Sequence, residues 1–298
     1  MLIALLIPLG LAIFVYSFCL LRAAIKLRVT PDLEALAIGA VTNFFDTLGI
    51  GCYAPTMAWF NLRGIVPDRL IPATMLVGHA WPSMTQAVIF LILLGVLVDP
   101  ALLIGCVTAV VLGGILGAPL VIKSRVWAVQ LIVAIALLVA AIFYILANLG
   151  LMPLGGTASS LPVELMVLAI GANFLFGVLL NFGVGNYAPT LAMFSLMGMD
   201  PRLSFPIMAV GAAIAASGAS VRHIANGAID LRIALGIAIG GIPAVLIAAF
   251  IVKAMPVEVL RWLVTFVVLY ASAMMFKSAR SRRLELHMRP GEIIVDRL

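Results

Sequence analysis

The chain has 298 residues, of which 64% are hydrophobic and only 10% are charged. Soluble domains carry about a quarter charged residues, so this composition excludes an ordinary soluble protein and predicts a polytopic membrane protein. The formal net charge is +6, and its basic residues cluster beside apolar runs, as the flanks of membrane helices do; it therefore indicates no nucleic-acid partner.

The apolar runs are long enough to cross a bilayer, which takes about 20 helical residues, and none shows strand-like alternation. We therefore predict an all-α polytopic fold. The candidate segments in chain order are Leu2–Leu21, Leu33–Leu62, Leu70–Val98, Ala101–Ile122, Val126–Leu149, Val163–Met197, Leu203–Val221, Ile233–Val252 and Trp262–Phe276. The first lacks a basic leading region and a cleavage pattern, so residues 1–32 are expected to be a retained transmembrane helix followed by a basic loop.

A glycine-punctuated phrase occurs twice, as GIGCYAPTMAWFNLRG at 49–64 and as GVGNYAPTLAMFSLMG at 183–198. The two copies match at ten of sixteen positions without a gap. We interpret residues 33–149 and 163–276 as duplicated halves joined by a linker at 150–162, with a basic cytoplasmic tail at 277–298. Duplicated halves are common in secondary transporters.

The two segments that contain the phrase are too long for a single ordinary span and have glycine and proline in the middle. Because these residues interrupt helices, each segment should be two half-helices joined near mid-membrane, the second beginning near Tyr53–Pro55 or Tyr187–Pro189. Each could cross once or turn back as a re-entrant hairpin. The positive-inside bias favours the hairpin, which gives seven full crossings, inverted halves and a cytoplasmic C-terminus.

Broken helices leave backbone N–H groups unpaired, and the N-terminus of a half-helix attracts anions. We therefore expect the two breaks to hold one small anion between them. The alternative is that the glycines only allow close helix packing. The candidate substrate-binding residues are Gly49, Gly51, Cys52, Tyr53 and Thr56 in the first copy, Asn181, Gly183, Gly185, Asn186, Tyr187 and Thr190 in the second, and His79 and Ser217 elsewhere.

Asp46 is the only formal charge well inside an apolar segment, which makes it a candidate proton carrier, with Asn43 and Thr47 beside it. The alternative is a structural aspartate that caps a half-helix. His79 lies in GHAWPS, where we expect another helix interruption; a buried, hydrogen-bonded histidine is favoured over a proton relay. For Ser217, close helix packing is favoured over ligand binding.

Cys19, Cys52 and Cys106 form no CxxC pair, and the three histidines are dispersed. We therefore expect no disulfide framework, no metal site and no cofactor.

The duplicated halves and the glycine-rich breaks resemble the sulfite exporter TauE/SafE family, also called DUF81-type permeases, over about residues 33–276. Members of that family typically show a G-x-G-G-G run followed closely by a proline. Here the later glycines are replaced by Cys52 and Tyr53 in one copy and by Asn186 and Tyr187 in the other.

This resemblance implies a secondary transporter of sulfite, an organosulfonate or a related sulfur-containing or carboxylic acid. With Asp46 as the candidate carrier, a proton is the expected coupling ion, and the residues favour no enzyme mechanism. An anion channel, and with less support an intramembrane enzyme, are the alternatives. The expected partners are the small anion, the lipid bilayer and a possible second copy of the chain. The expected location is the plasma membrane, which means the inner membrane of a bacterium.

Overall fold

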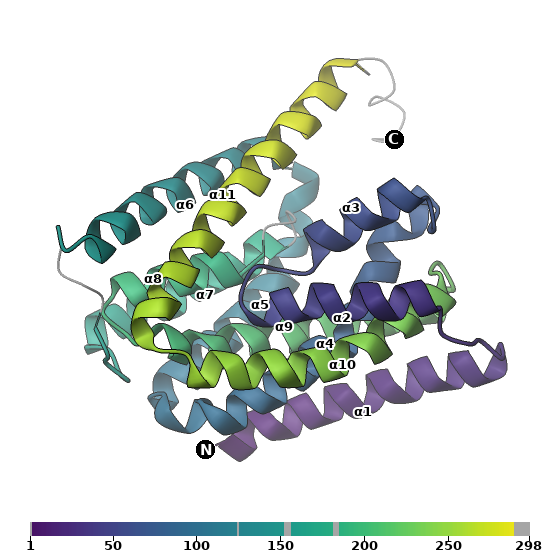
Figure 1. Cartoon of the computed structure of the whole chain (residues 1–298), viewed down its shortest axis with the longest axis horizontal. Coiled ribbons are helices and arrows are strands. Elements are labelled where there is room, and N and C mark those ends of the chain that lie inside the picture. Colours follow the sequence, from purple (N-terminus) through teal and green to yellow (C-terminus); the bar gives the residue numbers. More distant parts are fainter. Residues whose placement is uncertain (1, 124, 152–155, 181–184, 289–298) are drawn as a thin grey trace.

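A computed structural model describes residues 2–123, 125–151, 156–180 and 185–288 (Figure 1). Within these ranges the chain forms helices and no named strand, in agreement with the predicted all-α class. The α-helices are α1 (Leu2–Lys26), α2 (Leu33–Thr47), α3 (Tyr53–Arg63), α4 (Ile71–Leu93), α5 (Pro100–Lys123), α6 (Val126–Asn148), α7 (Val163–Leu180), α8 (Tyr187–Leu196), α9 (Ser204–Asn226), α10 (Leu231–Ala254) and α11 (Val257–Met288). Short 3-10 helices lie at η1 (Asp68–Leu70), η2 (Gly95–Leu97) and η3 (Pro201–Leu203).

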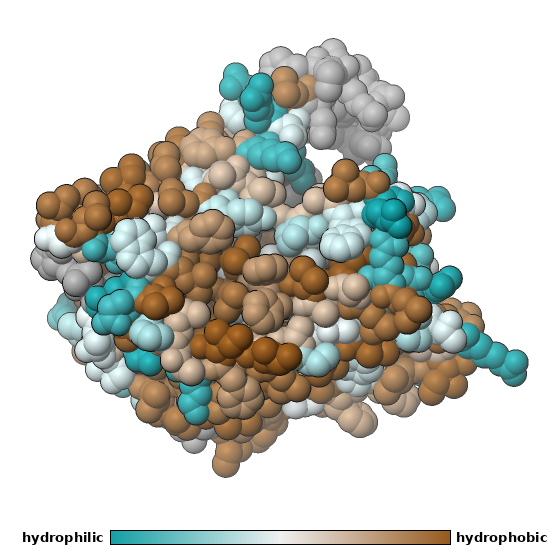
Figure 2. Space-filling view, in the orientation of Figure 1, coloured by the Kyte–Doolittle hydropathy of each residue, from teal (hydrophilic) through white to brown (hydrophobic). Residues whose placement is uncertain are grey.

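Eight helices in the described ranges are long and apolar enough to cross a membrane, namely α1, α4, α5, α6, α7, α9, α10 and α11. Figure 2 shows apolar side chains along the flanks of the helices and hydrophilic ones gathered toward the ends. On α1 the exposed face carries large apolar residues such as Ile7, Phe14 and Ile25. Such a surface is stable against lipid and not against water, so the prediction of a polytopic membrane protein is confirmed.

Both segments that contain the repeated phrase are split into two helices, as predicted. In the first, α2 ends at Thr47 and α3 begins at Tyr53; in the second, α8 begins at Tyr187, the matching tyrosine. Gly49 and Gly51 have φ angles of +95° and +91°, a left-handed conformation that other residues adopt only with strain. The first phrase therefore needs its glycines for the shape of its backbone.

The first hairpin is re-entrant. Near the end of α3, Arg63 Nε lies 2.9 Å from Glu34 Oε1, and the Trp59 indole N–H donates to the same carboxylate at 3.0 Å. Glu34 is in the first turn of α2, so α3 ends on the side where α2 began. The hydrogen bonds from Arg63 and Trp59 hold the pKa of the exposed Glu34 carboxyl below its usual value.

The second hairpin follows the same path. Ala158, shortly before α7, forms an isolated bridge with Met199, shortly after α8, and its N–H donates to Gly198 O at 3.3 Å. The entrance and the exit of the hairpin therefore lie together. In Figure 1 the end of α3 points to the right of the bundle and the end of α8 to the left.

Each hairpin packs mainly on a helix of the other predicted half: α2 lies on α10 and α7 lies on α5, while α4 and α9 pack together in the centre. Close approach of the backbones requires glycine. A Cβ added at Gly240 would collide with the backbone of Leu36, and one at Gly177 would collide with that of Val110. The halves proposed from the sequence are thus interlocked, whereas their inverted orientation stays a prediction.

Helix α4 is continuous, so the interruption expected in GHAWPS is wrong. Pro82 lies inside the helix and is buried against α10, where a Cβ at Gly241 would touch its ring. Proline removes one backbone donor, but neighbouring helices in a membrane bundle tolerate that loss. His79 and the residues that follow it therefore lie on one uninterrupted helix, which contacts both hairpins.

Candidate functional site

The tip of the first hairpin is organised by Asp46, at the end of α2. Its Oδ1 accepts a hydrogen bond of 2.9 Å from the N–H of Cys52, the N-cap residue of α3. Asp46 is only 7% exposed. Among the described residues, ion pairs join Glu34 to Arg63, Asp200 to Arg202 and Asp32 to Arg232, and none of these pairs includes Asp46. The carboxylate thus caps α3, the structural role considered from the sequence, and it does so without a cationic partner there.

His79 on α4 joins α2 to α3. Its Nδ1 lies 2.9 Å from Asn43 Oδ1, and its Nε2 lies 2.9 Å from Thr56 Oγ1. Asn43 Nδ2 donates to Gly39 O at 2.7 Å, which leaves Oδ1 as the acceptor facing the ring, so Nδ1 carries a proton. The ring is fully buried and packs edge-on to Tyr53 with 5.6 Å between centroids. The favoured interpretation, a buried and hydrogen-bonded histidine, agrees with this geometry.

The start of α8 is held by different contacts. Asn186, its N-cap residue, donates through Nδ2 to Met208 O on α9 at 3.3 Å, and Tyr187 OH donates to Gln86 Oε1 on α4 at 3.2 Å. Thr190, which matches Thr56, is buried, and its hydroxyl has no hydrogen-bond partner within the described part of the chain. Position 213, which matches His79 in the same register, is Ala213. The histidine bridge is therefore specific to the first hairpin.

The two tips face one another. A Cβ added at Gly49 would lie 3.1 Å from Leu191 Cδ1, one turn into α8. His79 and Gln86 are seven residues apart on α4, or about 10 Å along its axis, so both contact faces lie on the same side of this helix. The geometry thus brings the two breaks to one region inside the bundle.

Among the described residues, the N-terminal N–H groups of α3 and α8 are the hydrogen-bond donors at these tips. The first N–H groups of a helix have no partner within it, and neither Cys52 nor Asn186 closes its helix with a side-chain cap. The helices α3 and α8 thus direct N–H groups and partial positive charge toward the region between them. Such a set of neutral donors suits a small anion.

The other predicted residues are distributed as follows. Thr47 donates to Asn43 O within α2, and Ser217 donates to Ile214 O within α9, so these hydroxyls serve their own helices. Gly185 has open space around its Cα. Asn181 and Gly183 lie outside the described residues. Among the described residues no group of three His, Cys, Asp or Glu side chains is placed to hold a metal ion.

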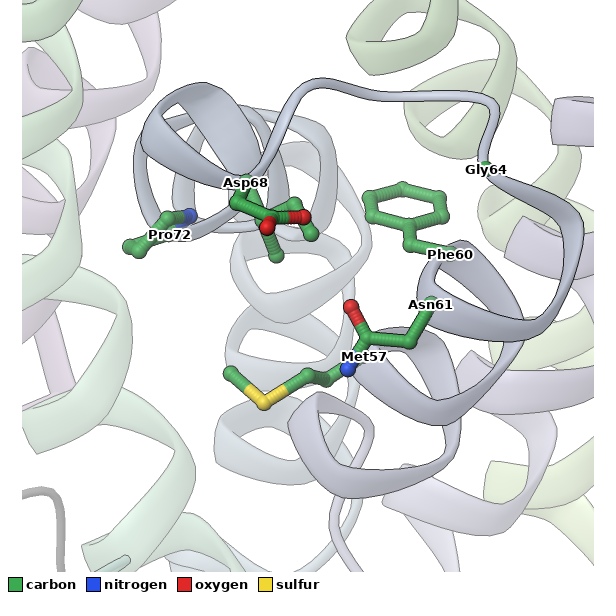
Figure 3. A pocket seen from close by; sticks show the side chains of 7 residues that line it. Met57, Phe60, Asn61, Gly64, Asp68 and Pro72 are labelled. Carbon is green, nitrogen blue, oxygen red and sulfur yellow. The ribbon is translucent and has the colours of Figure 1, made fainter. Parts of the chain in front are cut away.

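A pocket of about 510 Å³ opens beside the outer end of the first hairpin (Figure 3). It is lined from α3 by Met57, Phe60 and Asn61, from the following turn by Gly64, from η1 by Asp68, and from the start of α4 by Ile71 and Pro72. Tyr53, Met57 and Asn61 are four residues apart and so share one face of α3, which leads from this pocket to the tip.

The sequence analysis overlooked Gln86. It is fully buried, and its carboxamide contacts the first residue of α8. One signal was available: Gln86 follows His79 by seven residues, which puts both on the same face of an apolar helix.

Comparison with known proteins gave one match. The family described as sulfite exporter TauE/SafE matches residues 165–295. The match begins two residues after the start of the predicted second half and extends beyond its end. Neither a curated protein nor a solved structure matches the chain. The matched part of the chain therefore carries the similarity, already indicated by the repeated phrase, to the sulfite exporter TauE/SafE family, which is a family of membrane transporters and not of enzymes.

Proposed function

We propose that this protein is a secondary carrier of a small anion, which binds between the tips of the two helix hairpins. The observation that carries the proposal is the meeting of these tips, at Gly49 and Leu191, where neither N-cap residue, Cys52 or Asn186, closes its helix with its own side chain. Paired interrupted helices near the midplane are typical of transporter sites. The family match supports a sulfur-containing anion such as sulfite or an organosulfonate, with small carboxylates as the related class.

The unequal surroundings of the two matched helices favour a carrier over a channel. Met57 on α3 is 42% exposed, whereas Leu191, its match on α8, is fully buried. The reason is that α6 and α11 both pack on α8, where Tyr144 OH donates to Leu191 O at 3.1 Å. A carrier open to one side needs such a difference, because one path must be closed while the other is open. A channel needs a continuous path instead.

Asp46 is proposed to couple the anion to a proton. A carboxylate and a bound anion in the same low-dielectric region repel one another, so the anion binds more readily when Asp46 is protonated. Asn43 and Thr47, proposed beside it, keep hydrogen bonds to the α2 backbone and so maintain the helix that carries it. Coupling of this kind makes a proton and an anion travel together.

The direct test uses purified protein in proteoliposomes with radiolabelled methanesulfonate or sulfite inside or outside. A carrier shows saturable flux, accelerated exchange when unlabelled anion is present on the opposite side, and no single-channel current in planar bilayers. Unitary currents would establish the anion channel instead. Absence of flux and of binding for every sulfur oxyanion and small carboxylate tested would remove the proposal.

The same proposal places the chain in the plasma membrane, in bacteria the inner membrane, with inverted halves and a cytoplasmic C-terminus. The opposite openings of the two hairpins in Figure 1 support the inverted arrangement. Association into a homodimer is proposed as well, and crosslinking in the membrane tests it.

A further inference from the structure

Gln86 offers a hydrogen-bond donor that nothing in the described structure accepts. Its side chain is fully buried in α4, and Nε2 has no partner. An unmade buried hydrogen bond is costly, so buried polar groups are nearly always paired with protein, water or a ligand. A donor left open beside the proposed anion site therefore points to a ligand there.

The orientation of this amide follows from Tyr187. The hydroxyl of Tyr187 donates to Gln86 Oε1 at 3.2 Å and has no other acceptor in the described residues. If the amide were turned round, that hydroxyl proton would lose its acceptor. Because Tyr187 is the first residue of α8, this hydrogen bond ties the Gln86 amide to the side chain with which that helix begins.

The repeat contains this amide only once. In the register of the repeated phrase Gln86 matches Ser220, whose hydroxyl is already bonded to Leu76 O at 3.3 Å. The second half therefore supplies α8 and the first half supplies the amide that faces it. Such an asymmetric pair defines one site rather than two equivalent ones.

We propose that Gln86 is a direct ligand of the transported anion, and that the site prefers oxyanions of single negative charge to dianions. This inference rests on the proposed function and adds to it the ligand and the charge of the substrate. The chemical class comprises sulfonates, hydrogen sulfite and monocarboxylates. All of them present two or more oxygens, which can accept from the amide and from the N–H groups of α8 together.

The charge preference follows from the donors. Gln86 and the backbone N–H groups are neutral, so they can stabilise an anion that has lost its water only through their partial charges. The cost of removing an ion from water rises with the square of its charge, so these donors offset one charge far better than two. Asp46, at the tip of the first hairpin that faces α8, repels a second negative charge more strongly still when it is charged.

The experiment measures binding of methanesulfonate and of sulfate to the purified full-length protein at pH 7 by isothermal titration calorimetry. The wild type is expected to bind methanesulfonate at least tenfold more tightly than sulfate. Gln86→Leu keeps the size of the side chain and removes the donor, so it should raise the Kd for methanesulfonate at least tenfold. Gln86→Glu replaces the donor with a carboxylate oxygen and should weaken binding further.

Asn173→Leu is the matched control. Asn173 is also a buried amide, but its Nδ2 donates to Ala169 O within α7, and the Kd for methanesulfonate should change less than twofold. Tyr187→Phe removes only the hydroxyl that orients the amide, and should weaken binding less than Gln86→Leu does. It also keeps the test decisive if the leucine variant fails to fold.

The outcomes separate this inference from the proposed function. Methanesulfonate binding that is unchanged in Gln86→Leu, or in a folded Tyr187→Phe when the leucine variant is not folded, overturns the role of Gln86 alone. Sulfate binding as tight as methanesulfonate binding overturns the charge preference. Wild-type protein that binds and transports neither these anions nor carboxylates refutes the carrier itself.

Discussion

Asp46→Asn isolates the charge at the tip of the first hairpin. The asparagine retains an oxygen that accepts from Cys52 N–H, the contact that measures 2.9 Å in the structure, so the cap of α3 should persist. What disappears is the negative charge and its protonation. Hydrogen bonds to a charged group contribute about 1 kcal/mol more than neutral ones, so we expect only a small loss of thermal stability.

The size of the electrostatic effect can be worked from the helix that links the two tips. Gln86 lies seven residues beyond His79 on α4, which is about 10 Å along the helix axis. His79 is bonded to Asn43, about one turn before Asp46, so we take about 10 Å as the separation between Asp46 and an anion beside Gln86. At an effective dielectric constant of about 20, two unit charges at this distance repel by about 1.7 kcal/mol. This corresponds to roughly an 18-fold change in anion affinity.

The direction in which pH changes the anion affinity follows from the charge of Asp46. In the wild type the repulsion is present while Asp46 is charged, so acidification should lower the Kd for methanesulfonate, by up to that factor. In Asp46→Asn the affinity should be independent of pH and close to that of the protonated wild type. In proteoliposomes the variant should lose accumulation driven by a pH gradient, while exchange of anion for anion continues at least in part.

Calorimetry at several pH values and flux assays with an imposed pH gradient check these expectations together. A wild-type Kd that does not vary with pH, or gradient-driven flux that persists in Asp46→Asn, would leave Asp46 with the structural role of capping α3. If the variant does not fold, Asp46→Glu provides the second measurement: it keeps the charge, so the pH dependence should remain even though the cap is displaced.

Three further predictions test the fold. Gly177→Ala should lower the melting temperature because its Cβ meets the backbone of Val110, whereas Gly171→Ala, with open space around it on the same helix, should not; equal effects would contradict the tight α5–α7 contact. Tyr144→Phe removes a hydrogen bond from α6 to α8 worth about 1 kcal/mol, so a Ser195→Cys reporter on α8 should react faster with a thiol reagent; an unchanged rate would argue against α6 as the cover of α8. With native cysteines replaced, Leu62→Cys and Arg282→Cys should be labelled from one side of the membrane and Ser160→Cys from the other, and any other pattern refutes the inverted halves.

The sequence by itself was sufficient for the class of the protein and for the position of its helix breaks. A composition with 10% charge and long apolar runs indicates a membrane protein, and the repeated phrase with glycine and proline in the middle of two overlong runs predicts a break in each. Helices α3 and α8 accordingly begin at Tyr53 and Tyr187. These properties are local, because they depend on the residues in one segment and on the thickness of the bilayer.

The path of each hairpin and the partners of its polar groups depend on contacts between distant segments. The ion pair of Glu34 with Arg63 shows that the first break turns back toward the start of α2, whereas the charge bias alone only favoured that result. Pro82 suggested a helix break because its cost is local, but α4 packs against α10 and continues through it.

The same dependence on distant contacts explains why the sequence did not indicate Gln86 as a site residue. Gln86 becomes a candidate only because α8, about one hundred residues further along the chain, folds back to bring Tyr187 against it. The two copies of the phrase nearly match in sequence, yet α8 is covered by α6 and α11 and α3 is left open. Similar local sequences have the same local structure, but their exposure and their hydrogen-bond partners are decided by the surrounding helices, and these differ between the two hairpins.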